Sequence, residues 1–177
     1  MLKRAKGFTL IELLIVVAII GILAALLIPN AITAIQKSKQ KGTMKDIVTI
    51  ATGCADYITD NGTFNTAKNG ALTAGDAFIQ DLAPFYVKII PVNDQWGQPF
   101  NIYTGTNGTA RGIDADDLGT DDFVIDSYGR DKATDGWAYD ETTPTSGMYI
   151  INSMDDFKND LVNWSGSWIR APRTAVE

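Results

Sequence analysis

The sequence contains no histidine and a single cysteine, Cys54. Without histidine the chain lacks the usual general base and the commonest transition-metal ligand, so Ser-His-Asp and Cys-His catalytic sites are excluded. One cysteine cannot form a disulfide within the chain. Positive charge is also scarce: 15 Lys and Arg stand against 21 Asp and Glu, and the net charge of −6 argues against a nucleic-acid-binding surface.

Charge is nearly absent from one long run near the N-terminus. The 21 residues from Phe8 to Ile28 include one charged side chain, Glu12. As a helix this run measures about 31 Å, enough to cross a hydrocarbon core of about 30 Å. A carboxylate inside a bilayer costs roughly 2.5–3.5 kcal/mol, so we expect Glu12 to have a partner from another chain or from a group made by processing. The alternative is a carboxylate that extends to the headgroups.

A short basic leader ends at Gly7 and is followed directly by Phe8-Thr9-Leu10-Ile11-Glu12 and the apolar run. This arrangement resembles the type III signal of type IV pilins and of type II secretion pseudopilins. The resemblance implies that residues 1–7 are a leader, that a prepilin peptidase cuts between Gly7 and Phe8, and that Phe8 is then N-methylated. It also implies that the new ammonium of Phe8 meets Glu12 of a neighbouring subunit, an ion pair that sets register more than stability.

Residues 8–28 are therefore expected to form the transmembrane half of a helix, and residues 29–60 its amphipathic half. We expect a continuous helix, kinked or locally melted between Gly21 and Pro29, rather than one that ends at the membrane surface. Cys54 is interpreted as a buried apolar residue rather than a reactive thiol. The apolar stripe of the second half comprises Ile32, Ile35, Ile47, Ile50 or Ala51, Cys54, and Tyr57 or Ile58.

The rest of the chain contains turn signals and short strand signals. Residues 61–76 are rich in small and polar types and predict a surface loop. Further on, a turn with a tryptophan leads into a short strand, Phe100–Tyr103. Three segments resemble the major pseudopilin of type II secretion: Asp94-Gln95-Trp96-Gly97 with its flanking prolines, Asp122–Asp131, and Asp160–Trp164. Gln95 departs from the proline that this family usually has at that position.

The same resemblance implies a calcium site in the loop from residue 126 to residue 140. Matched residue by residue, Asp131 is a side-chain ligand and Tyr128 a carbonyl donor. The loop is longer here than in the family, so Asp135 and Asp140 are candidates without a matching position. Calcium takes six to eight oxygen ligands, and a bound ion orders a loop much as a disulfide would. The alternative is an acidic, solvated loop that binds no ion.

The sequence thus predicts an α+β fold of the pilin type, in which a long N-terminal helix packs on a small antiparallel sheet within a globular region of residues 61–177. The resemblance implies a structural role rather than an enzymatic one: the subunit of a helical, homo-oligomeric pseudopilus that serves protein export by type II secretion. Prepilin peptidase, an inner-membrane assembly platform and minor pseudopilins are the implied partners. The helix would span the inner membrane once, with the globular part in the periplasm.

Two alternatives remain open from the sequence. The first is a major type IV pilus subunit used for adhesion, motility or DNA uptake. The second is a membrane-tethered enzyme or ligand-binding domain, which the absence of histidine and of any nucleophile motif argues against.

Overall fold

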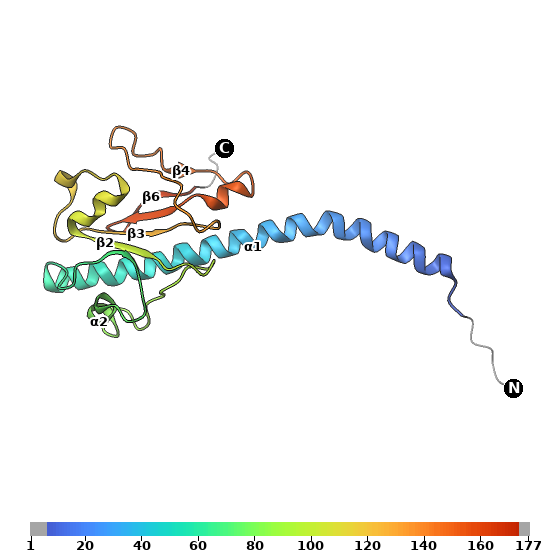
Figure 1. The fold of residues 1–177 in the computed structure, drawn as a ribbon, viewed down its shortest axis with the longest axis horizontal. Helices are drawn as coiled ribbons and strands as arrows, with labels where there is room; N and C mark the ends of the chain where they lie inside the picture. Colours follow the sequence, from blue (N-terminus) through green and yellow to red (C-terminus); the bar gives the residue numbers. More distant parts are fainter. Residues whose placement is uncertain (1–6, 174–177) are drawn as a thin grey trace. The chain divides into compact units, whose positions relative to one another are not determined.

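The computed structural model of this chain describes Gly7–Arg173. Most of the leader expected at residues 1–7 lies outside the described residues. The chain divides into two compact units, one up to Lys37 and the other from Ser38 onward. Helix α1, Leu10–Asn61, contributes to both units, and the sheet belongs to the second (Figure 1).

Helix α1 is unbroken from Leu10 to Asn61, through both Gly21 and Pro29. A continuous helix is therefore confirmed, and the alternative of local melting between these two residues is wrong, whereas the alternative of a kink stays a prediction. Proline removes one backbone hydrogen bond from a helix. Near this point a side chain adds a bond to the backbone: the Thr33 hydroxyl donates to the Pro29 carbonyl oxygen at 3.1 Å. The apolar run thus passes into the amphipathic half without an interruption.

The second unit is built on a six-stranded sheet with the strand order β1-β2-β3-β5-β6-β4. Neighbouring strands are antiparallel, except for the parallel edge pair β4 and β6. The strands are β1 Asn69–Ala71, β2 Asn101–Thr104, β3 Phe123–Ser127, β4 Met148–Tyr149, β5 Leu161–Trp164 and β6 Ser167–Pro172. The short helices are α2 Ala77–Leu82, η1 Gly105–Arg111, η2 Ala115–Asp117 and η3 Asp155–Lys158. The predicted α+β class is confirmed, with one parallel pair in an otherwise antiparallel sheet.

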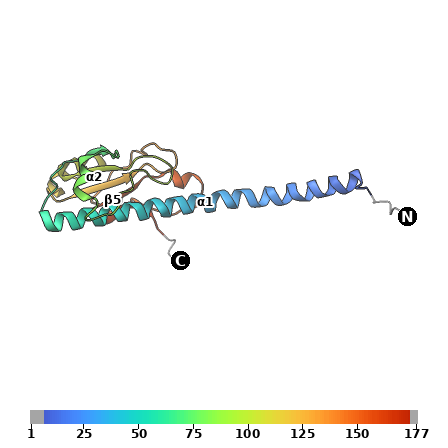
Figure 2. The ribbon, with the colours of Figure 1, turned by 90° about the horizontal axis from the view of Figure 1, so that it is seen from below.

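Both faces of this sheet are covered. Successive side chains of a strand point to opposite faces, and Ile102 and Ile125 pack in the cluster that includes α1, whereas Tyr103 and Val124 belong to a second cluster. Figures 1 and 2 show the sheet lying along the part of α1 that ends at Asn61. Because both faces are covered, every residue of β2 and β3 is buried.

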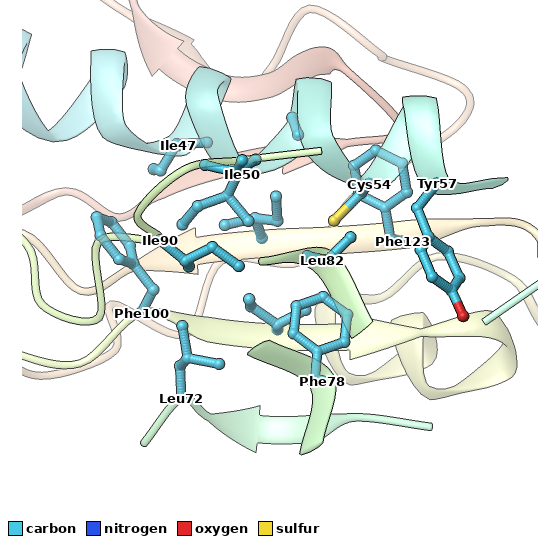
Figure 3. Packing of buried hydrophobic residues seen from close by; sticks show 14 of the residues in the cluster. Ile47, Ile50, Cys54, Tyr57, Leu72, Phe78, Leu82, Ile90, Phe100 and Phe123 are labelled. Carbon is cyan, nitrogen blue, oxygen red and sulfur yellow. The ribbon is translucent and has the colours of Figure 1, made fainter. Parts of the chain in front are cut away.

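The stripe predicted on the second half of α1 is confirmed from Ile47 onward. Five of its members lie in the main core cluster: Ile47, Ile50, Ala51, Cys54 and Tyr57. Figure 3 shows Ile47, Ile50, Cys54 and Tyr57 on the side of α1 that faces the sheet. The assignment of Ile32 and Ile35 to this stripe is wrong, because they are 44% and 55% exposed. They extend the exposed apolar surface of the first half instead.

The prediction of a loop over residues 61–76 is wrong in part. Asn69–Ala71 forms β1, which pairs with β2 so that Gly70 lies opposite Ile102. These residues have little intrinsic strand propensity, and the exposed edge of β2 supplies the pairing instead. The strand predicted at Phe100–Tyr103 is confirmed with a shift of one residue.

Candidate functional site

The first half of α1 presents its apolar side chains to the outside. Leu10 is 82% exposed and Leu26 is 68% exposed, and Phe8, just before the helix, is 82% exposed. Among the described residues, α1 is the one helix long and apolar enough to cross a membrane, judged by length and composition. Such a surface is stable only against lipid or against other apolar helices.

The start of α1 is fixed by a reciprocal cap. The Glu12 carboxylate accepts from the Thr9 backbone N–H at 2.8 Å and from the Thr9 hydroxyl at 2.7 Å. In return, the Glu12 N–H donates to the Thr9 hydroxyl oxygen at 3.3 Å. This is the capping box of a Thr-x-x-Glu sequence, in which the side chains satisfy backbone N–H groups that the first helical turn leaves without partners.

The cap places the one acid of the apolar run beside the predicted cleavage point. Gly7 and Phe8 immediately precede the cap and are exposed. A carboxylate oxygen has more than one acceptor site, so the capping bonds leave Glu12 able to accept from a further donor. Cleavage, N-methylation and the role of Glu12 in assembly stay predictions.

In the second unit, the tryptophan turn is held by Asp94. Its Oδ1 accepts from the backbone N–H groups of Trp96 and Gln98, both at 2.9 Å, and its Oδ2 accepts from the Ser127 hydroxyl at 2.7 Å. Asp94 is 5% exposed. Two of the three segments that carry the family resemblance therefore meet at one buried carboxylate.

Gln95 uses the N–H that a proline would lack. This N–H donates to the Thr43 hydroxyl of α1 at 3.2 Å, and the Gln95 side chain donates to Asp46 at 2.8 Å. The departure from the family pattern therefore replaces a rigid turn residue with two bonds to the helix. The turn itself is closed by Gly97, which adopts a φ of 82°.

A buried ion-pair network surrounds Arg111, at the end of η1, on the face of the sheet opposite to α1. Arg111 Nε donates to Asp126 Oδ2 at 2.6 Å, and Arg111 Nη1 donates to Asp160 Oδ2 at 3.0 Å. The Arg111 side chain is 6% exposed, and those of Asp126 and Asp160 are fully buried. Asn101 donates to the second oxygen of Asp126 at 2.8 Å. Burial opposes the charge on Arg111, but the bond to Asp126 more than compensates, so the pKa of Arg111 is raised.

A second arginine extends this network to the last strand. Arg170 of β6 pairs with Asp135, whose side chain is 20% exposed. Asp135 also exchanges backbone bonds with Asp160: the Asp160 N–H donates to Asp135 at 3.2 Å, and the Asp135 N–H donates to Asp160 at 3.4 Å. The Arg170 guanidinium lies 5.2 Å from the ring centre of Trp137. The two arginines thus pair with neighbouring carboxylates, Arg111 with Asp160 and Arg170 with Asp135.

The pKa of Asp160 reflects this crowding of acids. Burial raises it first, and the charge of Asp135 raises it further, against the opposing charge of Arg111; the result is a pKa of about 7. By contrast, the pKa of Asp135 is lowered, because the N–H groups of Trp137 and Asp160 outweigh its partial burial.

The four predicted calcium ligands do not converge. Asp131 accepts from the Ala133 N–H at 3.3 Å, and Asp140 accepts from Thr142 and Thr143 within its own turn. Asp135 pairs with Arg170, and the Tyr128 ring faces the Arg111 guanidinium at 5.3 Å. Within Gly7–Arg173, no group of three or more His, Cys, Asp or Glu side chains is placed to hold a metal ion. Calcium binding stays a prediction.

Sequence reasoning missed Thr9, Arg111 and Arg170. The Thr-x-x-Glu spacing was a short-range signal that could have identified Thr9. Arg111 had no such signal, because its carboxylate partners lie 15 and 49 residues away along the chain. Only the pairing of β3 with β5 brings Asp126 and Asp160 toward the same side chain.

Comparison with known proteins gives a consistent result. Residues 2–28 match the prokaryotic N-terminal methylation motif. Over 133 residues the chain is 32% identical to the type II secretion system core protein G of Aeromonas hydrophila. This alignment covers 69% of this chain and 92% of that protein. Core protein G of Vibrio cholerae is 32% identical over 68% of this chain and 84% of its own length. Core protein G of Pseudomonas aeruginosa is 33% identical over 60% of this chain and 79% of its own length. No solved structure gives a significant match.

Proposed function

Because this chain belongs to the family of type II secretion system core protein G, we propose that it is the structural subunit of a helical pseudopilus that drives protein export. Its role is assembly rather than catalysis. The chain is inserted as a membrane-anchored precursor, is cleaved after Gly7 by a prepilin peptidase, and is methylated at Phe8.

The exposed apolar half of α1, with its single acid, carries this proposal. A lone membrane anchor has no need of a carboxylate one turn into the span, where it costs roughly 2.5–3.5 kcal/mol. Cleavage creates an ammonium at Phe8, and Glu12 lies four residues further along the helix. When apolar helices lie side by side in a filament, this ammonium and the Glu12 of a neighbour neutralise each other in a low-dielectric bundle and fix the stagger between subunits.

Location and partners follow from the same assembly. The helix spans the inner membrane with its basic leader in the cytoplasm, and the sheet-containing unit faces the periplasm. Copies of this chain are its main partner in the filament. An inner-membrane assembly platform lifts subunits out of the bilayer, and minor pseudopilins complete the filament.

The first experiment deletes the gene in the native host and measures two outcomes together. We expect extracellular proteins to accumulate inside the cell, with surface pili unaffected. Restoring the wild-type chain should restore secretion. If secretion continues while surface pili or motility disappear, the major type IV pilus function replaces the one proposed here.

A second experiment separates the charge of Glu12 from its cap. Glutamine caps a helix as glutamate does, so Glu12→Gln keeps the capping box and removes the charge, whereas Thr9→Val weakens the cap and keeps the charge. We expect Glu12→Gln and Glu12→Ala to accumulate as processed subunits without filaments, and Thr9→Val to assemble. Normal filaments from Glu12→Gln together with failure of Thr9→Val would assign Glu12 to the cap alone.

A further inference from the structure

Two arginines from outside the loop that was expected to bind a metal ion place positive charge next to it. The acids that meet in this part of the fold are Asp126, Asp135 and Asp160, and two guanidinium groups contact them directly. Arg111 bridges two of these carboxylates at 2.6 and 3.0 Å. Arg170 contacts the third. A guanidinium offers five N–H donors in a fixed plane, so one arginine can join several carboxylates as a multivalent cation would.

The oxygen atoms of these carboxylates are poor ligands for a divalent cation. Calcium requires six to eight oxygens with free lone pairs. Each oxygen of Asp135 and of Asp126 already accepts from at least one protein donor, which leaves fewer lone pairs for a cation. The buried atoms of the network without a hydrogen-bond partner include one oxygen, Asp160 Oδ1, and two nitrogens, Arg111 Nη2 and Arg170 Nε. Of these three atoms, only the oxygen could bind a cation, and the two nearby guanidinium groups would repel that cation.

The network also joins the elements that a loop-ordering ion would have to join. Arg111 links the end of η1 to β3 and to the residue that precedes β5. It also donates to the Thr134 hydroxyl of the loop at 3.2 Å. Arg170 ties the loop to β6, and its guanidinium lies 5.7 Å from the ring centre of Tyr149 in β4. Tyr149 in turn accepts from Gln40 of α1 at 3.1 Å.

We infer that Arg111 and Arg170 hold the loop from Asp126 to Asp140 in place of a bound divalent cation, so that the fold of this chain does not depend on calcium. The two side chains that take the place of the ion come from distant points of the sequence, Arg111 from the end of η1 and Arg170 from β6. This inference goes beyond the pseudopilus function, because it concerns the folded chain itself. It predicts that calcium and chelators leave the melting temperature unchanged.

The test uses the full chain in detergent micelles, with unfolding followed by tryptophan fluorescence. We expect the same melting temperature in millimolar calcium and in excess EGTA. Arg111→Met should lower the melting temperature by about 10–20 °C, because it leaves two buried carboxylates without their cation. Arg173→Met is the matched control: it removes an exposed arginine just after β6 and should shift the melting temperature by no more than about 2 °C.

Two results would overturn the inference. One is a melting temperature that calcium raises by several degrees, with the increase lost in Asp131→Ala. The other is an Arg111→Met protein as stable as the Arg173→Met control. If Arg111→Met yields no folded protein, Arg170→Met decides instead, because its partner Asp135 is less buried: it should melt below the control in calcium and in EGTA alike, and equal stability to the control would count against the inference.

These measurements do not depend on filament assembly. Failure of the proposed function would appear in secretion and pilus assays, whereas failure of this inference would appear in the response of the isolated chain to calcium. A chain that secretes normally but melts in a calcium-dependent way would refute the inference and leave the function standing.

Discussion

At the scale of single residues, Cys54 illustrates how burial decides chemistry. Its side chain is fully buried in the cluster between α1 and the sheet, and this burial raises the pKa of the thiol. The thiolate is the reactive form of cysteine, so a raised pKa makes the residue inert. The interpretation of Cys54 as a buried apolar residue is confirmed.

We predict that Cys54 in the native chain resists a thiol reagent in mildly alkaline buffer and reacts fully once denaturant is added. The physical reason is twofold: the reagent cannot reach the sulfur, and the fold disfavours the thiolate. Absorbance of the released chromophore from a disulfide reagent gives the measurement, with Cys54→Ala as the background. Rapid labelling without denaturant would show that the cluster opens readily.

Which residues could be foreseen depended on the range of their partners. The processing and assembly residues are predicted by a contiguous signal, and a spacing of three residues could have indicated the Thr9 cap. Arg111 lies in a polar stretch of Gly and Thr and looks like a solvated surface residue until the sheet is assembled. Of the three acids that the arginines join, Asp135 was a candidate ligand from the sequence, whereas Asp160 and both arginines were not.

At the scale of elements, the tryptophan turn ties α1 to β3. Gln95 donates to α1 through Thr43 and Asp46, while the Asp94 carboxylate closes the turn and accepts from Ser127 at the end of β3. This turn connects the helix and the sheet directly through hydrogen bonds. It therefore fixes the register of the two layers, which apolar packing alone specifies only loosely.

Asp94→Ala is predicted to lower the free energy of unfolding by about 2–4 kcal/mol, because it leaves three donors without their acceptor in a buried site. Asp114→Ala is the matched control: Asp114 is an exposed aspartate that also accepts from a backbone N–H two residues on, at 3.3 Å, and its loss should cost no more than about 1 kcal/mol. Urea unfolding of the full chain in detergent measures both. Equal effects from the two variants would show that the turn does not hold the layers together.

Elements with their own periodic pattern were predictable, and elements defined by a neighbour were not. The stripe on α1 and the strand around Ile102 follow their hydrophobic spacing. β1 has the sequence Asn-Gly-Ala and becomes a strand only because β2 offers an unpaired edge. The two exposed isoleucines of α1, Ile32 and Ile35, continue the helical spacing but precede the part of α1 that the sheet covers.

At the scale of the whole molecule, the unit from Ser38 onward has a core of its own. Both apolar clusters consist of residues beyond Lys37, and the polar link between Gln40 and Tyr149 also lies within this unit. The apolar surface that needs lipid or other helices lies in the unit up to Lys37. Stability and assembly therefore depend on different parts of the chain.

A chain that begins at Ser38 is accordingly predicted to be a soluble monomer. Its melting temperature should lie within about 5 °C of that of the full chain in detergent, because no member of the core clusters is removed. Size-exclusion chromatography with light scattering gives the mass, and circular dichroism gives the transition. An aggregated or unfolded product would show that the first unit contributes to the core.

The overall architecture was within reach of the sequence because its two largest determinants are local. The uninterrupted apolar run and the amphipathic stripe after it specify one long helix, and the alternation at Phe100–Tyr103 specifies a sheet strand. The order of the strands is not local: β6 lies between β5 and β4, and nothing in Ser167–Pro172 indicates that neighbour. The network around Arg111 depends on this order and was therefore out of reach as well.

The position of β6 has a consequence for the timing of folding during export. It is the last strand of the described chain. The edge strand β4 precedes it in the sequence, yet within Gly7–Arg173 β4 pairs with no strand other than β6. Arg170, the partner of Asp135, is also part of β6. In the proposed orientation, this strand crosses the membrane after all the other strands of Gly7–Arg173. Until then the outer edge of β5 is unpaired and Asp135 lacks its cation. A subunit stalled before Ser167 therefore exposes this edge to periplasmic proteases and chaperones, whereas in a subunit that has exported β6 the edge is paired.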